Sequence, residues 1–294
     1  MRQHIPRRDW RHRRPPRLHR VHHPAALTGN ATATRNPTGN PEDHPTMNKT
    51  VHMVMNGKGG CGKSLIASLL AQILAAQTPD LLCVDVDPTN RTLSRFAALN
   101  VHGLELLDAT RQINPRQFDT LVEWLLDHSG DAVIDNGASG FVPLLAYLSR
   151  SGVLELLREH GVDVLLHVPI IGGESLDDTA NGFTALMEET DADAVVWLNP
   201  FFGPVERAGK RFVDSPIYTD VAHRVRCVVN LQDWDRATYG QDLADMRAAG
   251  LTFAEALAPN STLGAMPRHR LHKVWNDIAG QLAGIRLNHQ GAAA

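Results

Sequence analysis

The sequence predicts an α/β protein with a mostly parallel sheet and helices on both faces. Three observations lead to this class: short apolar runs, segments of helical periodicity between them, and polar residues directly after several of the runs. Continuous apolar runs are typical of parallel strands that are covered on both faces, and their alternation with helical segments gives a three-layer arrangement. Polar residues at the carboxyl ends of such strands predict a ligand site in one crevice of the sheet.

Length and composition exclude several other classes. The 294-residue chain is 43% hydrophobic and 21% charged, which is typical of a globular protein with a sizeable core. No apolar run reaches the roughly 18 residues that a membrane span needs, so we expect no integral membrane segment. The cysteines, Cys61, Cys83 and Cys227, lack the spacing of a metal site. We expect reduced thiols in a cytoplasmic protein.

Residues 1–46 differ in composition from the rest of the chain. They hold nine Arg and three acidic residues, so their net charge is +6. The net charge of the whole chain is −3, so the remaining residues carry −9. No hydrophobic period is visible, which predicts a disordered basic extension. Two interpretations stay open: a basic arm for nucleic acid or an acidic partner, or an over-extended start with the native chain beginning near Met47. The segment is not a secretory signal peptide, because no apolar h-region follows the arginines.

A glycine-rich segment follows the first predicted strand, Val51–Met55. It reads NGKGGCGKS and fits the phosphate-binding loop G-x-x-x-x-G-K-[ST], with Lys63 and Ser64 at its end. Glycines let backbone N–H groups approach an anion closely, and the helix expected over Ser64–Ala76 adds the positive end of its dipole. We expect Lys63 to reach the β- and γ-phosphates of a nucleotide and Ser64 to hold Mg²⁺. The predicted nucleotide-binding residues are Gly57, Lys58, Gly59, Gly60, Cys61, Gly62, Lys63, Ser64 and Leu65.

Lys58 places a second lysine at the start of this loop. The run Lys58–Ser64 reads KGGCGKS and resembles the deviant loop K-G-G-x-G-K-[ST] of the ParA/MinD family of P-loop ATPases. The resemblance implies bound ATP and a three-layer P-loop NTPase fold over residues 47–294. It also implies an ATP-dependent homodimer, in which Lys58 crosses the interface and contacts the nucleotide of the other subunit. The alternative is a solvated loop cation.

Two further apolar runs end in carboxylates. Leu81–Val86 leads into Asp85-Val86-Asp87-Pro88, which resembles the family's D-x-D-P-Q segment, with Thr89 in place of the glutamine. The resemblance implies that Asp85 lies near Mg²⁺ and that Asp87 orients or activates the attacking water. The alternative is that Asp87, followed by proline, caps a helix. The run 131–135 ends in Asp135, which has the form of a Walker B acid and is expected to bind Mg²⁺ through water.

The loop Asn136–Gly140 is expected to act as a switch that senses the γ-phosphate. Most ParA and MinD relatives have D-x-P-P at this turn, whereas this chain reads IDNGASGFVPL with proline only at Pro143. Together with the Lys58–Ser64 run, this segment resembles the TraL branch of the family, found among conjugal-transfer proteins.

Asn199 directly follows another apolar run, residues 193–198. In related ATPases an asparagine at this strand end hydrogen-bonds the adenine, and an amide can both donate and accept. The alternative is a simple turn residue before proline.

The remaining elements are predicted from periodicity and apolar runs. His167 and Trp124 are expected to pack in the core, and the final helix is expected to dock on the core because its polar face has few cations. We expect strands at 104–107, 162–168 and 224–231, and helices at 89–99, 115–128, 233–250, 251–257 and about 271–285. Residues 141–160 are expected to form one or two helices, with Gly152 as a possible break. A loop and a helix are expected over 172–189, and a loop at 201–216.

These features predict a Mg-ATP-dependent ATPase that acts as a dimerisation switch. Water would attack the γ-phosphate in line, with Lys63 and Lys58 of the partner subunit neutralising charge and Asp87 positioning the water. The resemblance implies a role in plasmid conjugal transfer or positioning of transfer machinery, with a protein partner that the sequence does not name.

Three alternatives remain. The first is a ParA-like plasmid or chromosome partition ATPase, although the −9 body argues against nonspecific DNA binding. The second is an ATP-binding module with little hydrolysis. The third is a biosynthetic amidoligase-like enzyme, which would need a small-molecule pocket that the sequence does not locate.

Overall fold

The computed structural model describes residues 49–78 and 80–283, and the expectations for residues 1–46 lie outside them. The described residues form a seven-stranded sheet in the order β3-β2-β4-β1-β5-β6-β9, and every pairing in it is parallel. The strands are β1 (Lys49–Val54), β2 (Leu82–Asp85), β3 (His102–Gly103), β4 (Ala132–Asp135), β5 (Val162–Ile171), β6 (Asp193–Asn199) and β9 (Val225–Asn230).

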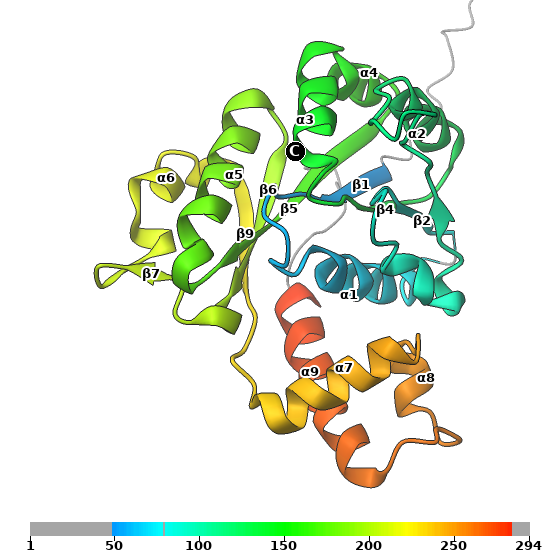
Figure 1. Cartoon of the computed structure of the whole chain (residues 1–294), viewed down its shortest axis with the longest axis vertical. Helices are drawn as coiled ribbons and strands as arrows, with labels where there is room; N and C mark the ends of the chain where they lie inside the picture. The colour runs from blue at the N-terminus through cyan, green and yellow to red at the C-terminus, as the bar shows by residue number, and fades with distance from the viewer. Residues whose placement is uncertain (1–48, 79, 284–294) are drawn as a thin grey trace, which may run out of the picture. The chain divides into compact units, whose positions relative to one another are not determined.

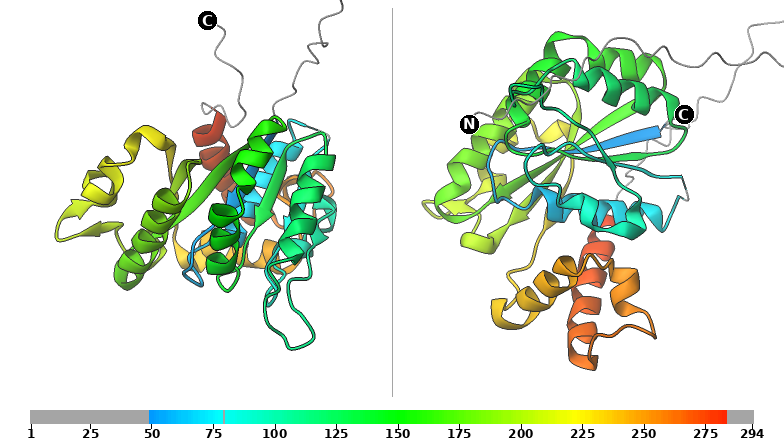
Figure 2. Two further views of the ribbon diagram at one scale, coloured as in Figure 1. Left: turned by 90° about the horizontal axis from the view of Figure 1, so that it is seen from above. Right: turned by 45° about the vertical axis from the view of Figure 1, so that its right-hand side comes forward.

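Helices cover both faces of this sheet, as Figures 1 and 2 show. On one face the core joins strand residues to four helices: α2 (Gln117–Asp127), α3 (Phe141–Arg150), α4 (Val153–Glu159) and α5 (Leu176–Glu189). On the other face a second core joins α1 (Lys63–Ala75), α7 (Gln241–Ala248), α8 (Phe253–Leu257) and α9 (Ala265–Ala283). The sheet is thus the middle of three layers, and the predicted fold class is confirmed.

The central strands are buried on both faces, which explains their continuous apolar sequences. Residues 50–54 of β1 are all buried, and so is every residue of β2 and β4. Alternate residues of β1 enter different cores: Val51 and Met53 pack with α2–α5, whereas Val54 packs with α1. Side chains at the carboxyl ends of the strands therefore meet along one edge of the sheet.

Several predicted elements are confirmed with small shifts in their bounds. The 141–160 segment forms two helices, and Gly152 between them has φ +65°, a conformation that favours glycine. His167 is fully buried, and Trp124 packs against the α2–α5 core. The final helix begins at Ala265 and buries Leu271, Val274 and Ile278 against α1 and its neighbours.

Three predicted elements are wrong. Residues 89–99 form two 3₁₀ turns, Leu93–Arg95 and Ala97–Leu99, instead of a helix, because acidic side chains take up the backbone N–H groups there. The strand expected at 104–107 lies earlier, at His102–Gly103. The expected loop at 201–216 contains a two-stranded hairpin, β7 (Glu206–Arg207) and β8 (Lys210–Arg211), before the short helix α6 (Pro216–Thr219).

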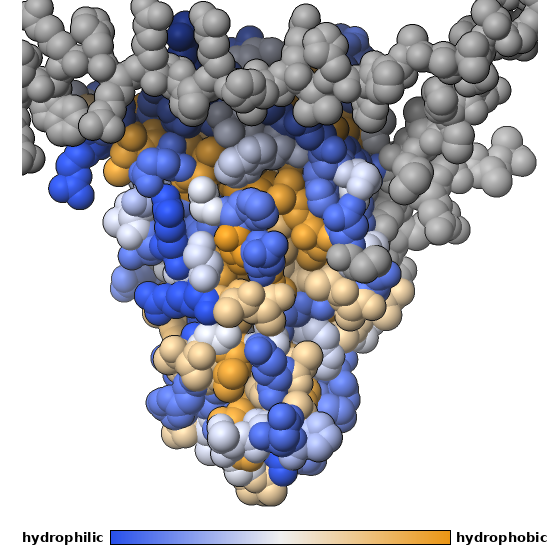
Figure 3. Space-filling view, turned by 90° about the vertical axis from the view of Figure 1, so that its right-hand side faces the viewer, coloured by the Kyte–Doolittle hydropathy of each residue, from blue (hydrophilic) through white to orange (hydrophobic). Residues whose placement is uncertain are grey.

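The surface mixes hydrophilic and hydrophobic residues along the face that Figure 3 shows. Within residues 49–78 and 80–283, the structure contains no helix that is both long enough and apolar enough to span a bilayer.

Candidate functional site

The glycine-rich loop joins the end of β1 to the start of α1 and lines a cavity of about 570 Å³. Helix α1 begins at Lys63, and Gly62 before it has φ +102°, a left-handed conformation that favours glycine. A side chain at Gly57 would press on Phe141, because a Cβ there would lie 3.0 Å from its ring. The free N–H groups of the first turn of α1 and its positive dipole end make this loop suited to phosphate.

Lys63 is held by the loop itself. Its Nζ donates to the carbonyl oxygen of Lys58 at 2.8 Å, and the residue is only 7% exposed. The ammonium is thus fixed beside the cavity, in the position from which the motif is expected to reach phosphates.

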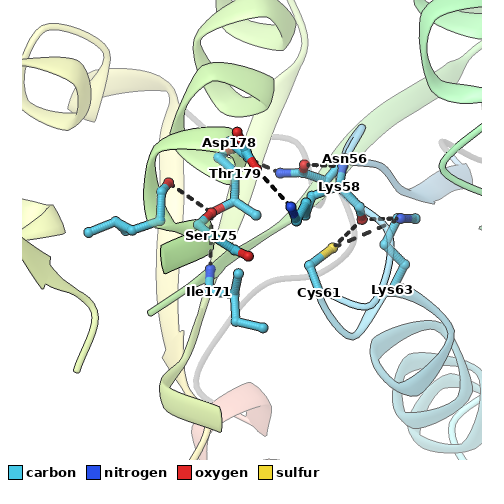
Figure 4. A network of polar contacts seen from close by, with 9 residues as sticks. Asn56, Lys58, Cys61, Lys63, Ile171, Ser175, Asp178 and Thr179 are labelled. Carbon is cyan, nitrogen blue, oxygen red and sulfur yellow. Dashed lines mark hydrogen bonds and ion pairs between the residues drawn. The ribbon is translucent and has the colours of Figure 1, made fainter. Parts of the chain in front are cut away.

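The side chain of Lys58 points to α5 of its own chain, as Figure 4 shows. Its Nζ forms an ion pair of 2.7 Å with Asp178, and both side chains are well exposed, at 37% and 57%. An exposed ion pair of this kind contributes about 0–1 kcal/mol, so Lys58 can exchange this partner at little cost.

Asn56 shapes the start of the loop and is fully buried. Its Nδ2 donates to the carbonyl oxygens of Pro169 and Thr179. Its Oδ1 accepts from the N–H of Lys58 (Figure 4). Gly182 on α5 makes room for it, because a Cβ there would lie 2.8 Å from the Asn56 amide oxygen. Asn56 therefore connects the phosphate-binding loop to β5 and α5.

Asp135 ends β4 beside Asp85, its register partner on β2. Its carboxylate is almost completely buried, and neither oxygen has a hydrogen-bond partner among the described residues. Burial raises the pKa of Asp135 to about 7, and the nearby Ser64 side chain partly offsets that rise. A buried carboxylate without a partner is costly in the ligand-free protein and is ready to accept a cation or a donor.

Asp85 uses both of its oxygens within the protein. One accepts from the N–H of Asp87 at 3.1 Å, and the other accepts from both the N–H and the hydroxyl of Ser94 at 3.2 Å. Burial raises the pKa of Asp85, and these hydrogen bonds work against the rise. Asp85 thus organises the turn after β2.

Asp87 lines the cavity after β2 and lies against the switch loop. One carboxylate oxygen accepts from the N–H groups of Thr89 at 2.8 Å and Asn90 at 2.9 Å, so it caps a turn in the way that the alternative prediction described, although no α-helix follows. A Cβ on Gly137 would lie 2.6 Å from the other oxygen. Glycine at this position of the switch loop is therefore what lets Asp87 occupy its place.

The donor set suits Mg²⁺, which prefers hard oxygen ligands and keeps several waters beside one or two carboxylates and substrate phosphates. The Asp135 carboxylate has free lone pairs, and the Ser64 hydroxyl lies close enough to lower its pKa. Ser64 and Asp135 therefore fit the predicted metal site. Asp85, whose oxygens already accept three hydrogen bonds, fits as a neighbour that supports the site.

A second cavity of about 320 Å³ adjoins the first and is more apolar. Asn199 at the end of β6 lines both cavities; its Nδ2 donates to the Cys61 carbonyl oxygen at 3.1 Å and its Oδ1 accepts from the N–H of Phe201. Arg236 lies over the Phe201 ring, 4.6 Å from its centroid. Asn199 thus links the phosphate-binding loop to a cavity with an aromatic wall.

The structure brings most of the predicted site residues to one place. The predicted residues that do not line the 570 Å³ cavity lie in the same loop or at the ends of β2 and β4: Gly57, Lys58, Cys61, Asp85 and Asp135. Sequence reasoning missed Asn56, Phe201 and Arg247, for which no local motif gives a signal. The predicted residues that line the cavity are Gly59, Gly60, Gly62, Lys63, Ser64, Leu65, Asp87 and Asn199.

Comparison with known proteins decides the family. The model of the CbiA family, described as the CobQ/CobB/MinD/ParA nucleotide binding domain, matches residues 52–280. The chain belongs to this nucleotide-binding family. Two proteins named TraL, both from Escherichia coli, are 43% and 44% identical to it over 234 residues, which cover 79% of this chain and 96% of each relative. The resemblance to the ParA/MinD family and to TraL is therefore confirmed.

Solved structures of the family resemble the chain more distantly. The MinC:MinD cell division protein complex of Aquifex aeolicus and a ParA family ATPase of Chlorobium tepidum TLS each match with 17% identity and a TM-score of 0.48. Each match covers 80% of this chain, and 96% and 98% of the solved chains respectively.

Proposed function

We propose that this chain is a Mg-ATP-dependent ATPase that switches between a monomer and an ATP-bound homodimer. The observation that carries the proposal is the convergence of Lys63, Ser64 and Asp87 on one cavity, with the unpartnered carboxylate of Asp135 beside them. A phosphate-binding loop needs the first two residues, hydrolysis needs a group that positions water, and the metal needs a free carboxylate.

Hydrolysis would proceed by attack of water on the γ-phosphorus. The new bond joins the water oxygen to phosphorus, while the bond between phosphorus and the β–γ bridging oxygen breaks and ADP leaves. Asp87 positions the water with the oxygen that faces Gly137, and Lys63 neutralises charge on the phosphates. Mg²⁺, held by Ser64 and through water by Asp135, would neutralise charge on the phosphate oxygens when bound.

The adjoining apolar cavity would take the nucleoside of ATP. It shares a wall with the phosphate cavity, so a base seated there stays within reach of the phosphate-binding loop. Phe201 offers an aromatic wall for the base and Asn199 an amide that can hydrogen-bond it.

In the dimer, Lys58 would leave Asp178 and contact the nucleotide of the other subunit. Support comes from the deviant loop of the family and from the exposure of the Lys58–Asp178 ion pair, which makes the exchange inexpensive. The identity to proteins named TraL further supports a role in plasmid conjugal transfer or positioning of its machinery, together with a protein partner.

Hydrolysis by the full chain tests the catalytic part of this proposal. Wild type should release phosphate from ATP only with Mg²⁺ present. Lys63→Ala should lose ATP binding, and Asp87→Ala should keep binding while hydrolysis falls about 100-fold or more, as expected for a residue that acts on the attacking water. Release of phosphate by Asp87→Ala at the wild-type rate would contradict the role of Asp87.

A further inference from the structure

Arg247 on α7 lines the phosphate cavity. Within the described part of the chain its guanidinium makes no ion pair and no side-chain hydrogen bond, and its Nε is both buried and unpartnered. Arg247 is partly buried, and a guanidinium that loses part of its hydration is stabilised by an acid or an anion beside it. Arg247 therefore places a cation next to the phosphate-binding loop that no acid of the described residues pairs with.

The surroundings of Arg247 add to this deficit of negative charge. Burial is the main cause that lowers the pKa of Arg247, and the like charge of Arg95 lowers this pKa further. The charge of Asp135 raises it. Arg95 is exposed on the turn after β2 and forms no ion pair among the described residues either. Arg247 thus lines the cavity beside another cation and without an ion-pair partner among the described residues, an arrangement that an anionic ligand would stabilise.

The position of Arg247 selects one part of the nucleotide. Four residues line both the phosphate cavity and the apolar cavity: Leu65, Asn199, Phe201 and Arg247. Arg247 is the charged residue of the four. If the loop holds the β- and γ-phosphates and the apolar cavity holds the nucleoside, the shared wall lies beside the phosphate that joins them.

We propose that Arg247 binds the α-phosphate of the bound nucleotide, an inference that rests on the proposed function. The guanidinium offers several N–H donors in a planar fork that suits phosphate oxygens. The contact would also connect α7 to the phosphate-binding loop through the ligand. Gly250, just after α7, already abuts the turn that carries Arg95, because a Cβ there would lie 2.5 Å from the Arg95 carbonyl oxygen.

Calorimetric titration of the full chain with Mg-ATP and with ADP tests this assignment. Arg247→Gln should weaken both nucleotides by a similar factor of about 10–100, the usual effect of losing a hydrogen bond to a charged group. Arg247→Lys should weaken them less. Arg150→Gln, which removes an exposed arginine in the last turn of α3 away from the cavity, is the matched control and should bind like wild type.

Melting temperatures separate this role from a structural one. Without nucleotide, the melting temperature of Arg247→Gln should be no lower than that of wild type, because the change removes a cation that has no ion-pair partner among the described residues. When ADP is added, the melting temperature of Arg247→Gln should rise less than that of wild type. Wild-type affinity in Arg247→Gln, a loss confined to ATP, or a lower melting temperature of the ligand-free variant would each overturn the assignment. Failure of the wild type itself to bind nucleotide would overturn the proposed function instead.

Discussion

Lowering the pH from 7 to 5 should destabilise the sheet through two buried histidines, His52 on β1 and His167 on β5. Their rings lie 2.9 Å apart, from His52 Nδ1 to His167 Nε2, and the indole of Trp197 contacts His167 Nδ1 at 3.0 Å. An indole N–H can only donate, so His167 Nδ1 accepts, its Nε2–H donates to His52, and His52 carries its proton on Nε2. That last N–H is buried and has no partner in the part of the chain that the structure describes. This network assigns both rings to the neutral state.

The magnitude follows from the shift in pKa. Burial and the charge of Arg226 lower the pKa of His52 from 6.5 to about 3, and burial lowers that of His167 well below 6.5. The unfolded chain therefore binds more protons, so stability is complete above pH 6.5 and falls as the pH drops from 6.5 toward 3. At about 1.4 kcal/mol per pH unit, protonation of His52 in the unfolded state costs about 2 kcal/mol at pH 5.

Urea unfolding of His52→Leu and of the wild type at pH 7 and pH 5 measures this effect. Other groups titrate over the same range, and Asp135, whose pKa is raised to about 7, does so in the opposite direction. The test is therefore the difference between proteins: the variant should lose about 2 kcal/mol less than wild type between the two pH values. His160→Gln, an exposed control, should match wild type. Equal losses in wild type and His52→Leu would refute the reasoning.

Two further predictions concern the site. Gly137→Ala should push Asp87 out of place, since the new Cβ would meet the side chain of Asp87. The rate of phosphate release should fall about 10-fold or more, with little change in melting temperature. An unchanged rate would show that Asp87 has room to adjust. Asp135→Asn should abolish the Mg²⁺ dependence of ATP binding, measured by titration with and without Mg²⁺, and should leave the ligand-free protein at least as stable at pH 8, because a buried unpartnered carboxylate is removed. Retained Mg²⁺ dependence would remove Asp135 from the metal site.

The central strands and the phosphate-binding loop could be predicted because their signals are local. A strand buried on both faces reads as a continuous apolar run, and the loop needs glycines and a lysine at fixed spacing. The helix expected at 89–99 failed for a reason that spacing does not reveal. Asp85 and Asp87 accept hydrogen bonds from the backbone N–H groups of residues 89, 90 and 94, which cap turns there instead of continuing into a helix.

The missed residues depend on contacts between distant parts of the chain. Asn56 belongs to no motif, and its role follows from carbonyl groups 113 and 123 residues away. Arg247 lies on a helix of weak amphipathicity far from the loop in sequence, and only the packing of α7 beside the cavity reveals it. The strand expected at 104–107 failed because Leu104 and Leu106 are buried, as their pattern indicates, but in an irregular segment after β3.

The solution mass of the protein with and without Mg-ATP tests the dimerisation switch most directly. Asp87→Ala should trap the ATP-bound state, so the mass of this variant should double when Mg-ATP is added. With ADP the variant should keep the mass of a monomer. The double variant Lys58→Ala/Asp87→Ala should still bind ATP but remain monomeric, because Lys58 of the partner subunit is missing from each nucleotide. A mass that never changes, or a dimer that forms equally well without Lys58, would contradict the switch and leave Lys58 as a loop cation paired with Asp178.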